Sequence, residues 1–458
     1  MQQCDLRGVT LTRSVLAQHL PRARVDVAAA LASVLPVIDQ VRTGGAAAIS
    51  DLCERFDGVR PPQLRVPQPV IDAALDRLSE PVRHAMEHAI EHLSAGHLAQ
   101  CPTEREIEIV PGGYIRQRWI PVHRVGLYAP GGLAVYPSSV IHNAMAARTA
   151  GVESLALASP PQAAYGGYPH PTILAASKLL DIREVYAVGG AQAIAMFAYG
   201  YDPTPAPRTV RDAPLAAAVA DSGCEPVDVI TGPGNIYVAA AKRAVQGRVG
   251  IDAEAGPTEI AIIADDSANA EYVAADLISQ AEHDPAAACV LITPSEELAN
   301  RCISHIEHQL SQTEHHQRVE CALNGSQSAI VLVDDLQAAI AVANAYAAEH
   351  LEIHTQSPRE VVPHIRNAGA IFLGEHSPVP LGDYLAGSNH VLPTGGTARF
   401  TAGLNVMTYL KPVQVIDYSA PALGHVSHDI CALAYAEDLP AHAQAIRIRM
   451  RSGEENAG

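Results

Sequence analysis

Short apolar runs alternate with longer helix-like stretches from residue 123 onward, and this alternation constrains the fold more than any other feature. In the first half of the region the apolar runs lie at residues 124–128, 154–158, 184–188 and 227–230. The helix-like stretches that accompany them lie at residues 138–150, 172–180, 191–199 and 235–245. Each stretch is long enough to carry the chain back over a sheet, as a connection between parallel strands requires. The pattern therefore predicts parallel strands with helices on the sheet faces.

The same alternation continues after Gly256. Further short apolar runs lie at residues 260–264, 289–293, 330–333, 351–354 and 370–373, again separated by helix-like stretches. A chain of 458 residues is too long for one ordinary core, since single domains commonly hold about 100–200 residues. We therefore predict an α/β fold with two doubly wound, Rossmann-like parallel-sheet units.

The N-terminal part of the chain shows helical spacing instead. We predict that roughly the first 110 residues are helical. One helix is expected over residues 25–41, ending at Thr43-Gly44-Gly45, and another over residues 70–98.

Two later segments also depart from the alternation. Residues 201–222 are rich in Pro, Ala and Asp, which predicts a surface insertion between a helix and the next strand. Residues 375–420 are rich in Gly, Pro, Ser and Thr and are predicted to form loops. A small helical tail is expected over residues 421–450.

Charge, hydropathy and cysteine usage exclude several classes of protein. The chain has 31 basic and 49 acidic residues, a net charge of −18, whereas a nucleic-acid surface needs clustered Lys and Arg. No apolar run reaches about 18 residues, so neither membrane spanning nor secretion is expected. The eight cysteines include no C-x-x-C pair, which favours reduced thiols in a cytoplasmic protein.

Gln280 and His283 form the first candidate site. They are three residues apart in a predicted helix that begins at Asn269 and ends before Pro285, so they share one helical face. An imidazole and a carboxamide oxygen placed in this way can bind a borderline cation such as zinc. Without a metal, His283 is simply an imidazole favoured by the dipole at the end of a helix.

Adjacent and distant polar residues give further candidates. Glu349 and His350 lie where a predicted helix meets a strand and suit two separate proton acceptors, although a capping or solvated pair is the simpler interpretation. Asp383 lies in a polar loop between glycines, which allow close approach of the backbone to a ligand. Glu437 and His442 lie in the tail. Spacing alone does not join these residues into one site.

Glycine-rich turns suggest where a cofactor binds. Gly232-Pro233-Gly234-Asn235 follows a strand and opens a helix, so its amide groups are suited to a diphosphate. It lacks the third glycine of the usual dinucleotide fingerprint. Gly131-Gly132 and Gly189-Gly190 also follow strands, and three such turns favour a ligand at that sheet edge. Ordinary strand-to-helix turns remain the alternative.

Eight segments, in a consistent order, resemble one known family. They are YAPGG (128–132), YPSS (136–139), GGAQAIA (189–195), GPGNIYV (232–238), AGPTE (255–259), SQAEH (279–283), AEHLE (348–352), and GDY with NHVLPT (382–394). Together they resemble the histidinol dehydrogenase family from about residue 24 to the C-terminal tail. One departure from the family is the insertion 201–222, which lies between Gln192 and Asn235.

The resemblance implies a zinc enzyme that oxidises L-histidinol to L-histidine through the bound aldehyde, using two NAD⁺. The implied zinc ligands are Gln280, His283, Asp383 and His442. His350 is implied as the general base and Glu349 as the residue that activates water. The residues implied to hold the substrate besides these are Thr258, His390 and Glu437, and those implied to line the NAD site are Tyr128, Gln192 and Asn235.

The resemblance also implies a division of the chain and a homodimer. An N-terminal segment (1–24) would precede a substrate and zinc domain (25–127 plus 259–404). The NAD-binding domain would comprise residues 128–258, including the insertion. A helical tail (405–458) would cross to the second chain, so that Glu437 and His442 complete the other site.

Three other functions fit part of the same pattern. A relative on this scaffold would oxidise another small alcohol, such as sulfopropanediol, although Glu437 and the acidic balance favour a cationic substrate. A zinc hydrolase with Glu349 acting on water would leave the glycine turns without a role. A ligand-binding protein without activity would not need Glu349 and His350.

Overall fold

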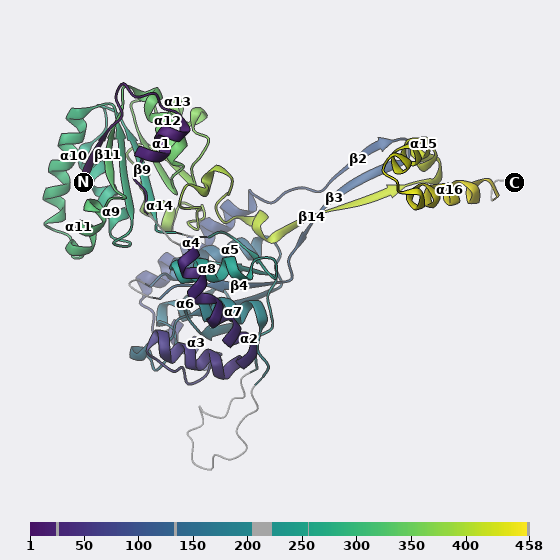
Figure 1. The fold of residues 1–458 in the computed structure, drawn as a ribbon. Coiled ribbons are helices and arrows are strands. Elements are labelled where there is room, and N and C mark those ends of the chain that lie inside the picture. Colours follow the sequence, from purple (N-terminus) through teal and green to yellow (C-terminus); the bar gives the residue numbers. More distant parts are fainter. Residues whose placement is uncertain (24–26, 132–134, 204–221, 255, 456–458) are drawn as a thin grey trace, which may run out of the picture. The chain divides into compact units, whose positions relative to one another are not determined.

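The computed structural model describes residues 1–23, 27–131, 135–203, 222–254 and 256–455 (Figure 1). The described residues form two compact units. The first comprises Met1–Gln100 and His123–Tyr409, and the second comprises Cys101–Val122 with the residues from Leu410 onward. Among the helices described, none is long and apolar enough to cross a membrane.

A six-stranded parallel sheet forms one half of the first unit. Its strand order is β1-β11-β10-β9-β12-β13. The bounds are β1 Gln2–Asp5, β9 Glu259–Ala264, β10 Ala288–Thr293, β11 Ala329–Leu332, β12 His350–His354 and β13 Ala370–Leu373. The chain proceeds from β9 through β10 to β11 on one side, then returns to β12 on the other. The direction of winding therefore reverses between β9 and β12, which is the switch point of a doubly wound sheet.

Helices cover both faces of this sheet (Figure 1). One face carries α9 (Ala270–Ala281), α10 (Glu296–Leu310) and α11 (His316–Asn324), and the other carries α1 (Arg13–His19), α12 (Leu336–Tyr346) and α13 (Pro358–Val361). Successive residues of β9 alternate between the two cores, since Ile260 packs with the α9 face and Ala261 with the α12 face. Burial on both faces explains why the strands appear in the sequence as unbroken apolar runs.

A five-stranded parallel sheet forms the other half, in the order β6-β5-β4-β7-β8. Its strands are β4 Arg124–Tyr128, β5 Ser154–Ser159, β6 Glu184–Ala187, β7 Val229–Thr231 and β8 Gly250–Ile251. The helices between them are α5 Pro137–Thr149, α6 Pro171–Leu179, α7 Gly190–Tyr199 and α8 Ile236–Val245. Winding reverses between β4 and β7, so the predicted α/β fold with two doubly wound sheets is confirmed.

The N-terminal helices differ from the prediction in their ends and in their packing. They are α2 (Val27–Asp57), α3 (Gln68–Asp76) and α4 (Glu80–Leu98), which pack on α7 and α8, on α6, and on α5, respectively. They therefore cover the five-stranded sheet, whereas the prediction placed residues 25–127 with the zinc domain. Local spacing does not reveal which sheet a helix will cover.

One predicted helix end is confirmed, and two other predictions are wrong. The helix predicted to end at Thr43-Gly44-Gly45 does end there, because α2 consists of two helices that meet in a kink at Gly45, whose φ of 53° and ψ of −139° are not helical. The helix predicted over 70–98 is two helices, because Pro81 begins a new one and cannot continue the last. Residues 2–5, predicted as helical, form an edge strand beside β11.

The second unit is an antiparallel sheet with two helices. Strands β2 (Arg105–Val110), β3 (Gly113–Pro121) and β14 (Leu410–Tyr418) pair in the order β14-β3-β2, and α15 (Ala420–Ala436) packs against α16 (Pro440–Glu455). The loop prediction for 375–420 and the all-helical tail 405–458 are therefore wrong at β14. The placement of 101–122 in the zinc domain is wrong for the same reason, since β14 and β3 are distant in sequence and pair only in the folded chain.

The predicted insertion cannot be compared with the structure in full, since residues 204–221 lie outside the described residues. Its flanks meet in two backbone hydrogen bonds, from Tyr201 N to Cys224 O (2.9 Å) and from Cys224 N to Tyr201 O (3.0 Å). The chain therefore leaves and rejoins the five-stranded half at one point.

A buried ion pair supports the turn after β7. Lys242 and Asp252 form the pair, Lys242 Nζ donates to Gly232 O (2.9 Å), and Asp252 Oδ2 accepts from Gly232 N (2.8 Å). We expect Lys242→Met to lower the free energy of unfolding by about 3–5 kcal/mol, because Asp252 is left buried and unpaired. Lys178→Met, which removes an exposed pair with Asp72, should cost less than about 1 kcal/mol. Urea unfolding of both variants tests this, and equal losses would contradict it.

Candidate functional site

A pocket of about 690 Å³ lies where the two sheets of the first unit contribute residues to one space. From the six-stranded sheet come residues at the amino ends of β9 and β12, including Thr258, Glu349 and His350. From the five-stranded sheet come residues after the carboxyl ends of β4 and β7, including Pro130 and Asn235. The five-stranded contribution lies outside carboxyl ends at a switch point, where open α/β sheets form crevices, whereas the six-stranded contribution lies at the amino ends of its strands.

The topology explains how distant residues meet at the amino ends of β9 and β12. Thr258 precedes β9 and Glu349 precedes β12, and these two strands are hydrogen-bonded neighbours. Helix α9 starts beyond the carboxyl end of β9 and runs back, so its last turn returns to the amino ends. Gln280 in that turn and His283 just after it therefore reach the same place.

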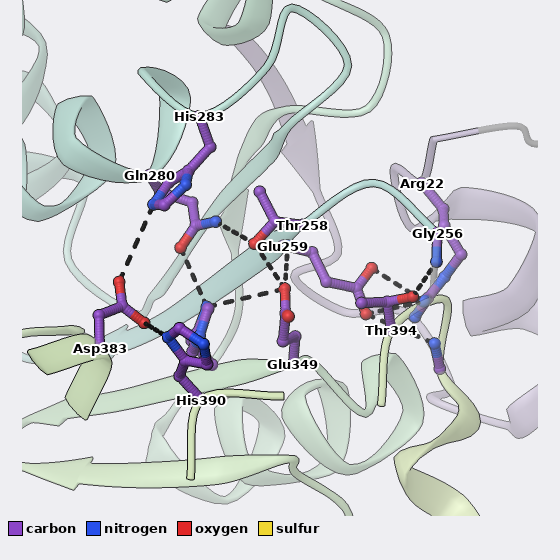
Figure 2. Close-up of polar contacts among 12 residues, drawn as sticks. Arg22, Gly256, Thr258, Glu259, Gln280, His283, Glu349, Asp383, His390 and Thr394 are labelled. Carbon is purple, nitrogen blue, oxygen red and sulfur yellow. Dashed lines mark hydrogen bonds and ion pairs between the residues drawn. The ribbon is translucent and has the colours of Figure 1, made fainter. Parts of the chain in front are cut away.

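Four side chains at this point form a connected hydrogen-bond network (Figure 2). Thr258 Oγ1 donates to Glu349 Oε2 (2.5 Å), and Gln280 Nε2 donates to Thr258 Oγ1 (2.6 Å). Gln280 Oε1 lies 3.0 Å from His350 Nδ1. Because an amide oxygen only accepts, His350 carries its hydrogen on Nδ1 and leaves Nε2 free to accept a proton.

His283 and Asp383 face each other beside this network, and His390 lies on the far side of Asp383 (Figure 2). His283 Nε2 is 4.0 Å from Asp383 Oδ2, and His390 Nδ1 is 3.9 Å from Asp383 Oδ1. Asp383 belongs to α14 (Val379–Tyr384), and His390 to the loop that follows. The predicted residues of the six-stranded half, including Gln280, are therefore brought together.

Burial dominates the electrostatics of the site. It raises the pKa of Glu349 to about 8, although hydrogen bonds from Thr258 and from the amide of Glu259 oppose the shift. Burial, with His283 and His390 nearby, lowers the pKa of His350 to about 3, and burial raises the pKa of Asp383 to about 7. The raised pKa of Glu349 and the lowered pKa of His350 both favour the uncharged form of the side chain. The 3.8 Å contact between the two side chains is therefore a polar contact rather than an ion pair.

The donor set fits a zinc ion. His283 and Asp383 supply an imidazole nitrogen and a carboxylate oxygen whose separation a single ion can bridge with a small adjustment, and Gln280 adds an amide oxygen. The raised pKa of Asp383 reflects a buried carboxyl that a cation would stabilise as the anion.

Of the three residues predicted to line the NAD site, one lines the pocket and two do not. Asn235 lines the pocket and caps α8, accepting from the amides of Tyr237 and Val238. Tyr128 and Gln192 are buried and lie outside the pocket lining. Tyr128 OH accepts from Gly190 N (3.0 Å), and Gln192 Nε2 donates to Asp57 Oδ2 (3.1 Å). Tyr128 therefore supports the glycine turn after β6, and Gln192 connects α7 to the end of α2.

Glu437 and His442 lie in the second unit, at the end of α15 and in α16, and both are exposed. Their predicted part in substrate and zinc binding stays a prediction.

Some residues around His390 were missed by the sequence analysis. Ser139 Oγ lies 3.3 Å from His390 Nε2 and belongs to the YPSS segment, whose position at the start of α5 was a usable signal. The His142 ring stacks on the His390 ring, with centroids 3.9 Å apart, and its Nδ1 accepts from His390 N. Nothing in the local sequence indicates that contact.

Comparisons with known proteins agree on one family. The family model described as histidinol dehydrogenase matches residues 20–450. Histidinol dehydrogenase of Thermobifida fusca is 54% identical over 100% of this chain and 99% of its own length, and that of Corynebacterium diphtheriae is 56% identical over 98% and 97%. The crystal structure of histidinol dehydrogenase from Elizabethkingia anophelis aligns with a TM-score of 0.88 and 30% identity over 99% of both chains. The chain therefore belongs to the histidinol dehydrogenase family.

Proposed function

We propose that this chain oxidises L-histidinol to L-histidine, through L-histidinaldehyde, with two NAD⁺ and one Zn²⁺ per chain, in the last steps of histidine biosynthesis. The observation that carries the proposal is the contact of His350 Nδ1 with Gln280 Oε1, which leaves Nε2 as the basic nitrogen beside Glu349 in the pocket that His283 and Asp383 also line. A biosynthetic enzyme of this kind is expected in the cytoplasm.

The metal would be held by Gln280, His283 and Asp383, with His442 of a second chain as the fourth ligand. A zinc ion held by these residues would serve mainly as a template that orients the substrate. Such positioning contributes substantially to rate, since oriented groups react with large effective molarities. Thr258, His390 and Glu437 would complete the contacts to the substrate.

His350 would act as the general base in the first oxidation. The bond to Gln280 fixes the ring, so that Nε2 takes the hydroxyl proton while the carbon transfers hydride to NAD⁺. Burial keeps the ring neutral in the empty pocket, which is the state that can accept a proton. The carboxylate form of Glu349, 3.8 Å from Nδ1, would stabilise the resulting imidazolium.

Glu349 would act in the second oxidation. Water adds to the aldehyde carbon, and Glu349 takes a proton from that water as the new C–O bond forms. His350, protonated in the first oxidation, gives its proton to the aldehyde oxygen, which completes the hydrate and makes the ring neutral again. His350 then takes the proton of the hydrate hydroxyl while hydride moves to the second NAD⁺, giving the carboxylic acid. A carboxyl group with a pKa near 8 is better matched to proton transfer at neutral pH than an exposed one.

The dinucleotide would bind at the carboxyl edge of the five-stranded sheet. Asn235 lies in the pocket at the start of α8, where backbone amides suit a diphosphate. Tyr128 and Gln192 would shape the neighbouring turn. We also propose a homodimer in which Glu437 and His442 of each chain complete the site of the other.

An assay of NADH absorbance with histidinol tests this function directly. We expect two NADH per histidinol consumed. Chelation should remove nearly all turnover and added Zn²⁺ should restore it, because the ion orients the substrate. Sulfopropanediol serves as the control substrate and should give little NADH. Turnover that needs no NAD⁺, or a preference for sulfopropanediol, would contradict the proposal.

A further inference from the structure

A second polar cluster lies beneath the pocket, on the same face of the six-stranded sheet. Glu352 and His354 occupy alternate positions of β12 after His350, so all three side chains point toward α9. Asp276 lies one helical turn before Gln280 on α9. His354 Nε2 is 3.2 Å from Glu352 Oε2 and 3.9 Å from Asp276 Oδ2.

The cluster is enclosed by apolar surroundings. Glu352 is 0%, His354 4% and Asp276 9% exposed. The elements packed around it contribute mainly apolar side chains to this core: Ile260 and Ile262 from β9, Leu291 from β10, Leu298 from α10, Val319 from α11, and Phe372 from β13. The two cysteines in the same core, Cys289 and Cys302, have thiols whose pKa burial raises to about 12 and about 11, so they carry no charge at neutral pH.

Two carboxyl groups in these surroundings cannot both be ionised without a compensating positive charge. Among the described residues, no lysine or arginine forms an ion pair with Asp276 or Glu352, and the basic group that faces both carboxyl groups is the His354 ring. Burial and the neighbouring Glu352 raise the pKa of Asp276 to about 8. His354 Nδ1 is buried and has no hydrogen-bond partner among the described residues, so the ring hydrogen is expected on Nε2, facing Glu352.

Glu352 is also the point where three elements of the site are joined. Its Oε1 accepts from the amide of Val379 (3.0 Å), the first residue of α14. Its Oε2 faces His354 on β12, and its carboxyl group meets Asp276 on α9. These three elements carry His350 on β12, Gln280 on α9 and Asp383 on α14.

We propose that Asp276 and Glu352 share one proton and form a clamp that positions α9, β12 and α14, and with them Gln280, His283 and Asp383 at the spacing a divalent ion requires. This inference rests on the proposed zinc site. Asp276 and Glu352 act as positioning residues, since neither lines the pocket.

Substitutions at Asp276 separate hydrogen bonding from packing. Asp276→Asn keeps a donor toward Glu352 without an ionisable group, whereas Asp276→Leu keeps similar bulk and removes the hydrogen bond. Zinc affinity of the full-length chain, measured by competition with a chromophoric chelator, should stay within about threefold for Asp276→Asn. It should weaken about 10–100-fold for Asp276→Leu, as for other groups that orient metal ligands. The exposed Asp266→Leu is the control and should bind zinc like the wild type.

The pH dependence of unfolding tests the shared proton independently. The pKa of Asp276 is raised on folding from an ordinary value of 3.8 to about 8, so the native state retains a proton that the unfolded chain loses. Wild-type stability should therefore fall relative to Asp276→Asn as pH rises from about 4 to 8, and the difference should level off above pH 8. Thermal unfolding of the zinc-free chains at pH 5, 6, 7, 8 and 9 measures it.

Each result decides the inference. A pH-independent difference between wild type and Asp276→Asn, or unchanged zinc affinity in Asp276→Leu, would overturn the clamp. Two zinc ions per wild-type chain and one in Asp276→Asn would also overturn it, since the cluster would then hold a cation instead of a proton. If Asp276→Leu does not fold, the pH series with Asp276→Asn still decides. The test of the clamp does not depend on the proposed reaction, since the pH series would support the clamp even if histidinol were not oxidised.

Discussion

Replacing His350 with asparagine is expected to lower kcat for histidinol by about 10²–10⁴-fold, the usual contribution of a general base. Asparagine can still donate to Gln280 Oε1, as His350 Nδ1 does in the native network, but it offers no basic nitrogen at the position of Nε2. The proton of the alcohol then has no acceptor when hydride leaves. Steady-state NADH formation with saturating histidinol and NAD⁺ measures the loss.

Zinc content distinguishes loss of the base from loss of the metal. His350 is not one of the proposed ligands, so the His350→Asn chain should retain about one zinc per chain, measured by elemental analysis after gel filtration. His376→Asn, at an exposed position, should leave both turnover and zinc unchanged. A His350→Asn protein that is folded but free of metal would mean that His350 holds the ion, and the proposed division of roles would fail.

Much of the fold was predictable because buried strands can be recognised in the sequence by their apolar residues. Strands covered on both faces become unbroken apolar runs, and β9 and β10 were predicted to within a residue or two. Strand β14 was missed because seven of its nine residues are exposed and the other two only half-buried, and because its partner β3 lies near residue 117. Its sequence does not mark it as a strand until that partner is known.

The site was predictable only where a short spacing already defines a geometry. Gln280 and His283, three residues apart at a helix end, do meet at one place. Glu349 and His350 are neighbours in sequence whose partners, Thr258 and Gln280, are 91 and 70 residues away. Those contacts depend on β9 and β12 being adjacent in the sheet, which follows from the winding of the whole domain. The site residues that lie far apart in the sequence were predicted from the family resemblance and not from their spacing.

Tyr128 and Gln192 have proposed cofactor roles that come from the family motifs alone. Both match the family segments, yet in this structure their polar atoms are engaged by Gly190 and Asp57 and neither lines the pocket. Tyr128 OH accepts from Gly190 and keeps its own hydrogen to donate, and Gln192 keeps its amide oxygen as an acceptor. Asn235, in contrast, lines the pocket directly.

Replacing Glu349 with glutamine is expected to slow oxidation of the aldehyde by about 10²-fold or more and to slow oxidation of the alcohol by much less. Glutamine retains an acceptor oxygen for Thr258 and for the amide of Glu259, so the network should persist, but the amide cannot take a proton from water. Single-turnover NADH formation from histidinol should then keep its first phase and lose its second. Glu259→Gln, at a buried carboxyl paired with Arg22 outside the pocket lining, is the control and should affect both phases equally. Equal slowing of the two oxidations in Glu349→Gln itself would contradict a role in water activation and leave Glu349 as a partner of His350 in both steps.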